Sequence, residues 1–139
     1  MAEKVEFELV SPEQLLMSQP VDMVTVPGGE GYFGVLAGHI PVLTTVVPGT
    51  IDIWEDDQII EKVFVEGGFC EVTQTRVTVL VDRALPVSKL VREEVEQQLK
   101  NCVEDLEDAK TDEEREAAEA NLNLARAKFE AATGQSANV

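Results

Sequence analysis

The residue composition of the chain changes sharply near Ser88, and this change limits the folds that the chain can adopt. All six prolines and all but one of the nine glycines precede it, among short runs rich in Val, Ile, Phe and Thr. Beyond it, Glu, Gln, Lys, Ala and Leu dominate. Pro and Gly interrupt helices and β-branched residues favour strands, so the first part is predicted to be β-rich and the second helical. We expect an α+β chain with a β-rich domain over residues 1–86 and a helical tail over residues 87–139 that has a short disordered end.

Turn-forming residues divide the first part into short strands. Val5, Phe7 and Leu9 alternate with Glu6 and Glu8, which is typical of a half-buried strand. The acidic segment 55–58 separates two apolar runs and is predicted to form a hairpin turn. Turn signals recur roughly every ten residues without a helical window between them, which favours a sandwich or a barrel over alternating strands and helices. The predicted strands cover residues 5–9, 21–26, 42–47, 51–54, 59–65, 69–73 and 77–81.

The second part carries two apolar stripes at helical spacing. Ser88 is the expected N-cap of the first helix. Thr111 and Glu114 form a capping box that starts the second helix, and Gly134 ends it. The break at Lys110 is short, so the helices are expected to fold back as an antiparallel hairpin. The stripes are Val91, Val95, Leu99, Cys102 and Leu106, and then Ala118, Leu122, Ala125, Phe129 and Ala132.

The formal net charge is −16, from 27 acidic and 11 basic residues. Nucleic acids and anionic lipids are poor partners for such a protein, because binding them requires clustered Lys and Arg. The acidic excess either favours basic protein surfaces or only maintains solubility. No stretch approaches the roughly 20 apolar residues of a membrane span, and no apolar signal region opens the sequence, so cytosolic residence is expected. Cys70 and Cys102 fall in different parts of the sequence and are expected to be reduced thiols.

Motifs that could support catalysis or cofactor binding are few. Residues 29–34 fit G-x-G-x-x-G, but a dinucleotide site needs a helix next, and Gly38 and Pro41 follow instead. His39 is the only histidine, and the sequence has neither a G-x-S-x-G elbow nor the ligand spacing of a zinc site. No catalytic residue, metal or cofactor is therefore expected. The aromatic residues are mostly core candidates, except that a ring exposed at Tyr32 or Phe33, in a Gly-rich turn, would mark an interface.

Residues 31–43 (GYFGVLAGHIPVL), preceded by Glu30 and followed by Pro48-Gly49, resemble the loop-and-strand signature of F-type ATP synthase epsilon subunits. Further matches lie at residues 7–13, 65–72 and 77–80. The resemblance implies a β-sandwich of about ten strands followed by a helical hairpin. It also implies a non-catalytic central-stalk subunit of a proton-translocating ATP synthase of the bacterial type. Such a subunit links the gamma subunit to the c-ring and is held peripherally, through the complex, at the cytoplasmic face of the inner membrane. The implied contact residues are Tyr32, Phe33, Gly38, His39 and Pro41.

The sequence departs from the family signature in the loop and in the tail. Ala37 replaces a Pro that many relatives have before Gly-His, which loosens that turn. Some relatives bind ATP through an I/L-D-x-x-R-A motif, but here Val91 and Glu94 occupy its Asp and Arg positions, so no ATP binding is expected. In other relatives a basic tail engages the catalytic alpha and beta subunits and inhibits ATP hydrolysis. This tail has nearly twice as many acidic as basic residues, so its inhibition is expected to be weak or absent.

Two other functions stay open at this stage. One is a stand-alone β-sandwich adaptor that binds another protein through its helical hairpin. The other is an enzyme that uses His39.

Overall fold

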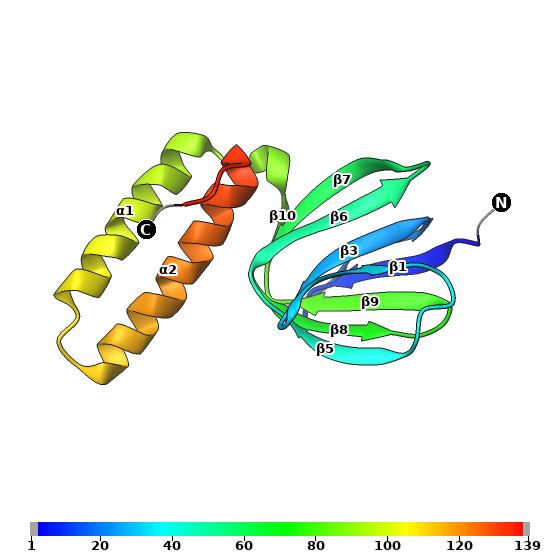
Figure 1. Ribbon diagram of the computed structural model, residues 1–139, viewed down its shortest axis with the longest axis horizontal. Helices are drawn as coiled ribbons and strands as arrows, with labels where there is room; N and C mark the ends of the chain where they lie inside the picture. Colours follow the sequence, from blue (N-terminus) through cyan, green and yellow to red (C-terminus); the bar gives the residue numbers. More distant parts are fainter. Residues whose placement is uncertain (1–2, 138–139) are drawn as a thin grey trace. The chain divides into compact units, whose positions relative to one another are not determined.

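The computed structural model describes residues 3–137 and divides the protein into two compact units, with the boundary after Pro86 (Figure 1). Within the described part, the first unit holds ten strands, and the second holds one 3-10 helix and two α-helices. The β-sandwich and the two-helix hairpin are both confirmed. The strands are β1 (Val5–Val10), β2 (Leu15–Val21), β3 (Met23–Gly28), β4 (Gly31–Val35), β5 (Val42–Val46), β6 (Gly49–Glu55), β7 (Gln58–Val65), β8 (Gly68–Val72), β9 (Arg76–Val81) and β10 (Ala84–Pro86).

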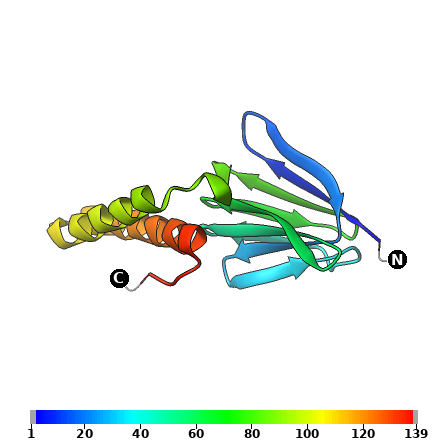
Figure 2. The ribbon, with the colours of Figure 1, turned by 90° about the horizontal axis from the view of Figure 1, so that it is seen from above.

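The strands form one continuous path, β10-β7-β6-β3-β5-β8-β9-β1-β2, with β4 added to β3. The β1–β9 pair is parallel and the other pairs are antiparallel. Strand β3 pairs with β6 over residues 23–25 and then reaches β5 only through the pair Gly28 and Val46. The path therefore turns at the end of β3, and the strands lie in two layers (Figures 1 and 2).

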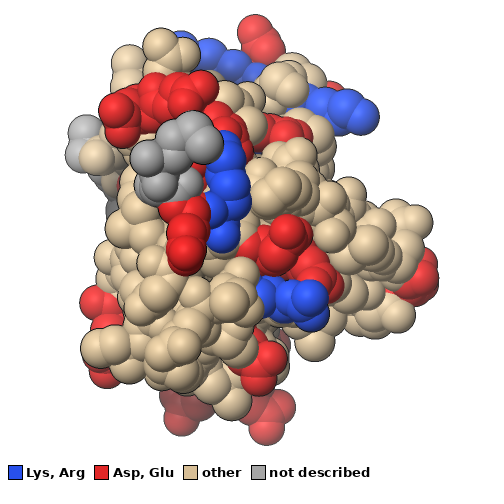
Figure 3. Space-filling model, turned by 90° about the vertical axis from the view of Figure 1, so that its right-hand side faces the viewer, with Lys and Arg blue, Asp and Glu red and all other residues tan. Residues whose placement is uncertain are grey.

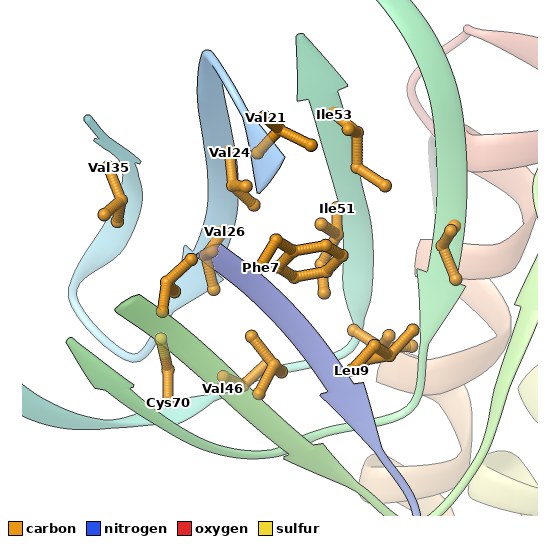
Figure 4. Packing of buried hydrophobic residues seen from close by; sticks show 14 of the residues in the cluster. Phe7, Leu9, Val21, Val24, Val26, Val35, Val46, Ile51, Ile53 and Cys70 are labelled. Carbon is orange, nitrogen blue, oxygen red and sulfur yellow. The ribbon is translucent and has the colours of Figure 1, made fainter. Parts of the chain in front are cut away.

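The core of the sandwich consists of the inward-facing residues of both layers. In Figure 4, the Phe7 ring of β1 points toward Val26 of β3 and Ile51 of β6. All three side chains are fully buried, and burying one such side chain stabilises the fold by about 1.5–3 kcal/mol. Cys70 of β8 lies in the same cluster. Val, Ile, Leu and Phe at alternate positions are therefore what specify the two layers.

Several strand predictions were incomplete or wrong. A single strand was predicted over residues 21–26, whereas Asp22 separates β2 from β3. Strand β2 was missed because it contains Pro20, which is tolerated because β2 is the last strand in the path. Strand β4 was missed because its residues were interpreted as a Gly-rich turn, and the three-residue strand β10 was also missed. Phe69 was a core candidate, but its side chain is 57% exposed.

The second unit contains η1 (Val87–Lys89), α1 (Arg92–Asp108) and α2 (Asp112–Thr133). Ser88 does not cap α1, because the 3-10 turn includes it and Val91 occupies the cap position without a side-chain hydrogen bond. Thr111 does cap α2: its Oγ1 accepts from the Glu114 N–H at 3.0 Å. The Glu114 carboxylate accepts from the Lys110 N–H at 2.8 Å, one residue earlier than a capping box requires. At the other end, Gly134 adopts the left-handed conformation at φ +71° and ends the helix as predicted.

The hairpin has its own small core. Leu99 and Cys102 of α1 pack with Leu122 and Ala125 of α2, as both stripes predicted. Val91 was placed in the first stripe, but it precedes the helix and is 44% exposed. The part of the expected disordered end at residues 138–139 lies outside the described residues.

Cys70 and Cys102 are free, buried, and in different units. Burial raises the pKa of the Cys70 thiol to about 11.

Between residues 3 and 137, no helix has the length and hydropathy that a membrane span requires.

Candidate partner-binding surfaces

Tyr32 begins the region that the sequence marked as an interface. It lies on β4 opposite Pro27 of β3, and its side chain is 63% exposed. Its hydroxyl accepts a hydrogen bond from the Thr50 N–H at 3.1 Å. A Cβ added to Gly49 would lie 2.6 Å from this hydroxyl and 2.8 Å from Pro27 Cβ, so Gly49 leaves the space in which the ring end sits.

The hydroxyl of Tyr32 occupies a place where the backbone ladder ends. Strands β3 and β6 stay paired up to Thr25 and Asp52. Two residues further along each strand, Thr50 would face Pro27, but the Pro27 carbonyl oxygen accepts from the Val47 N–H at 2.9 Å, where β3 turns toward β5. The Thr50 N–H bonds to the side chain of Tyr32 instead of a backbone carbonyl. Tyr32 therefore joins the β3–β4 hairpin to β6.

The loop over residues 36–41 carries the other predicted contacts. Gly38 has φ +85°, which favours glycine, and its N–H donates to the Gln74 carbonyl at 2.7 Å. This bond anchors the loop to the turn between β8 and β9. The His39 N–H donates to the Leu36 carbonyl at 3.2 Å, which closes a turn at the start of the loop.

The His39 ring is held by two contacts. Its Nδ1 lies 2.7 Å from the Ile40 carbonyl oxygen, and because a carbonyl only accepts, Nδ1 carries the proton. The Phe33 ring lies beside it, with 6.5 Å between the ring centroids. No group of three or more His, Cys, Asp or Glu side chains within residues 3–137 could hold a metal ion. The ring is thus oriented by its own loop and by Phe33.

The structure brings together three of the five predicted contact residues. Tyr32, Phe33 and His39 line one groove of about 350 Å³. Gly38 and Pro41 are exposed and lie outside its lining. The remaining lining residues are Gly28, Glu30, Gly31, Val42 and Thr44.

Sequence reasoning missed the most exposed apolar residues of this region. Ile40 is 77% exposed, Leu43 is 74% exposed and Leu36 is 53% exposed. A signal for them was present in the sequence, because residues 31–51 contain no Asp, Glu, Lys or Arg, although 27% of all residues are charged. Figure 3 shows the right-hand end of the molecule in Figure 1, where strand β5 begins. Uncharged surface, drawn in tan, separates the acidic and basic groups on this face.

A second apolar surface crosses the outer side of four neighbouring strands. Phe69 of β8 pairs with Leu80 of β9, Leu80 pairs with Val10 of β1, and Val10 pairs with Leu15 of β2. Paired residues point to the same side of a sheet, so these four residues form one line, here called the outer apolar row. Phe69 and Leu15 are each 57% exposed and Leu80 is 43% exposed. Exposed apolar residues that adjoin in this way make the row a candidate interaction surface.

Comparison with known proteins identifies the family. The family model described as "ATP synthase, Delta/Epsilon chain, beta-sandwich domain" matches residues 4–87, and the model for the C-terminal domain of the ATP synthase epsilon chain matches residues 92–138. The protein belongs to the ATP synthase epsilon family. The epsilon chain of Rhodospirillum centenum is 49% identical over 97% of this chain and 96% of its own length. That of Paramagnetospirillum magneticum is 53% identical over 83% of this chain and 86% of its own length.

Solved structures of ATP synthases contain the same fold at low identity. A subunit of the mitochondrial ATP synthase of Euglena gracilis has a TM-score of 0.83 at 22% identity and covers 95% of this chain and 82% of its own length. A subunit of the Tetrahymena thermophila mitochondrial ATP synthase, from its central stalk and c-ring, has a TM-score of 0.73 at 16% identity, over 95% of this chain and 98% of its own length.

Proposed function

We propose that this epsilon-family protein is a non-catalytic central-stalk subunit that links the gamma subunit to the c-ring of a proton-translocating ATP synthase. The observation that carries the proposal is the concentration of exposed apolar residues on an otherwise acidic sandwich. A strongly acidic protein would gain solubility from charge at these positions. Uncharged residues there favour burial against another protein.

Two surfaces on one rigid sandwich suit a linking role. In this proposal, Phe33 of β4 and the uncharged loop with His39 and Ile40 contact the c-ring, and the outer apolar row contacts gamma. Tyr32, Gly38 and Pro41 shape or extend the loop surface. Torque passes best between packed contacts, and the sandwich core supplies a close-packed body between the two surfaces.

The proposed location follows from the proposed partners. The protein would sit at the cytoplasmic face of the bacterial inner membrane and would be retained there only through the complex. It should therefore sediment with membranes that contain the c-ring and gamma. Retention by membranes that lack both would contradict this location.

Charge substitution in the outer apolar row tests the gamma contact. Phe69→Glu combined with Leu80→Glu places two charges in this row without touching the core. Co-purification of the full-length protein with gamma should fall at least about tenfold. The matched control, Gln58→Glu combined with Thr75→Glu, adds the same charge at exposed positions outside the row and should bind normally. Equal binding by both variants would reject the row as the gamma contact, and no stoichiometric binding of the unmodified protein to gamma would favour the stand-alone adaptor.

Two further experiments address the tail and His39. We propose that the tail does not inhibit strongly, so deleting the residues after Pro86 should leave ATPase activity of the reconstituted complex nearly unchanged. A several-fold rise in that activity would refute this. His39→Ala should lower affinity for the c-ring at most moderately. Loss of an enzymatic activity of the isolated protein would instead favour an enzyme that uses His39.

A further inference from the structure

We propose that the helical hairpin carries a docking groove for a basic amphipathic helix of a partner protein. The groove has a volume of about 520 Å³ and lies entirely within the second unit. Six α1 residues and Phe129 of α2 line it. The α1 residues are Glu96, Leu99, Lys100, Val103, Glu104 and Glu107.

The lining residues of α1 recur every three or four positions, so they share one face of the helix. From Glu96 to Glu107 this face runs about 16 Å, or three turns, at 1.5 Å per residue. The groove therefore has the length of a short helix.

The floor of the groove is apolar. Leu99 is 8% exposed and belongs to the hairpin core, and Val103 and Phe129 are partly buried against that core. An amphipathic helix presents apolar residues at three- and four-residue spacing, which suits a floor of this kind.

The rim of the groove is acidic. It holds three carboxylates and one ammonium group, that of Lys100. Glu96 pairs with Arg92 at 2.9 Å, whereas neither Glu104 nor Glu107 forms a salt bridge within residues 3–137. Carboxylates beside an apolar floor complement a helix whose apolar stripe is flanked by Lys or Arg. An acidic helix would be repelled, which makes a basic helix the occupant that fits.

The C-terminal residues of the protein are the competing occupant. Ala137 packs against the hairpin core, and its N–H donates to Glu130 Oε1 at 3.5 Å. The backbone past Gly134 therefore returns toward the hairpin. The hydrogen bond involves Glu130 of α2, which does not line the groove.

The test uses a fluorescently labelled three-turn helical peptide with a Leu stripe flanked by Lys, and anisotropy as the measure of binding to the full-length protein. Glu104→Gln combined with Glu107→Gln should weaken binding about tenfold, while circular dichroism stays unchanged. Glu116→Gln combined with Glu119→Gln removes the same charge from exposed positions on α2 and should change affinity less than about twofold. Val103→Thr, nearly the same shape but polar, should also weaken binding.

Three results would overturn the proposal. Equal weakening by the two glutamate pairs would mean that the peptide senses only net charge. Equal binding of a peptide with Glu in place of Lys would mean that the rim does not select a basic helix. At least about tenfold tighter peptide binding after deletion of residues 135–139 would mean that the protein's own end occupies the groove. None of these measurements requires gamma or the c-ring, so failure of the proposed central-stalk role leaves the test intact.

Discussion

Replacing Tyr32 with Phe removes one hydroxyl and keeps the ring, so it isolates the bond to the Thr50 N–H. A net protein hydrogen bond contributes about 0.5–1.5 kcal/mol. The strand ladder supplies no other acceptor at this point, so we expect a loss of about 1 kcal/mol. For a domain of this size that loss lowers the melting temperature by about 4–8 °C. Tyr32→Ala should cost more, because roughly a third of a ring surface of about 200 Å² is buried, which adds about 2 kcal/mol.

The assay combines thermal unfolding of the full-length protein with amide hydrogen exchange at Thr50. Tyr32→Phe should lower the melting temperature of the sandwich and speed exchange at this amide, since the amide loses its acceptor. Thr45→Val is the matched control, because Thr45 is exposed and its hydroxyl makes no hydrogen bond among the described residues. The control should stay within about 0.5 kcal/mol of the unmodified protein. If Tyr32→Phe changes neither stability nor exchange at Thr50, the tyrosine does not hold the end of the ladder.

Three further substitutions test other parts of the fold. Thr111→Ala should destabilise the hairpin by about 1 kcal/mol and speed amide exchange in the first turn of α2, whereas Thr111→Ser should not; identical exchange in both would exclude the cap. The Asp56 N–H holds the pKa of Asp22 below 3.8, so this carboxylate stabilises the fold above that pH and the stabilisation is lost as pH falls further. Asp22→Asn should therefore be less stable than the unmodified protein at pH 7 and equally stable in strong acid, and a constant difference at all pH values would contradict the linkage. Gly68 has φ +151°, and an added Cβ would lie 1.9 Å from the Leu80 carbonyl oxygen. Gly68→Ala should therefore abolish soluble folded protein. A cooperative melt of this variant near the melting temperature of the unmodified protein would disprove the expectation.

The sequence predicted the architecture because hydrophobic periodicity and turn residues are local signals. The alternation in residues 5–9 and the pattern Thr111 to Glu114 both describe interactions within a few residues. Strand β2 could not be found in this way, because the tolerance of Pro20 depends on β2 being the last strand in the path, which is a long-range property. The prediction that Ser88 caps the first helix was wrong for a local reason. Ser88 and its two neighbours form a separate 3-10 turn, which the sequence pattern did not reveal.

The candidate sites were predicted only in part for the same physical reason. Tyr32, Phe33 and His39 were selected from a local Gly-rich segment, and the structure does bring them to one groove. Phe69 and Leu80 were assigned to apolar strands, and which side each faces depends on the pairing register. Their exposure could be seen only once the strands were aligned.

The two kinds of proposed interface differ in their expected response to salt. The uncharged segment 31–51 offers a partner no charged side chain of its own, so binding there should change little with ionic strength. The hairpin groove relies on carboxylates at its rim, and charges at such exposed positions are screened as the Debye length falls from about 30 Å at 0.01 M to about 3 Å at 1 M. Raising salt should therefore release a basic helix from the hairpin while the uncharged segment of the sandwich keeps its partner. Because the two units fold around separate cores, a single protein can hold a permanent partner through its sandwich and exchange another at its tail.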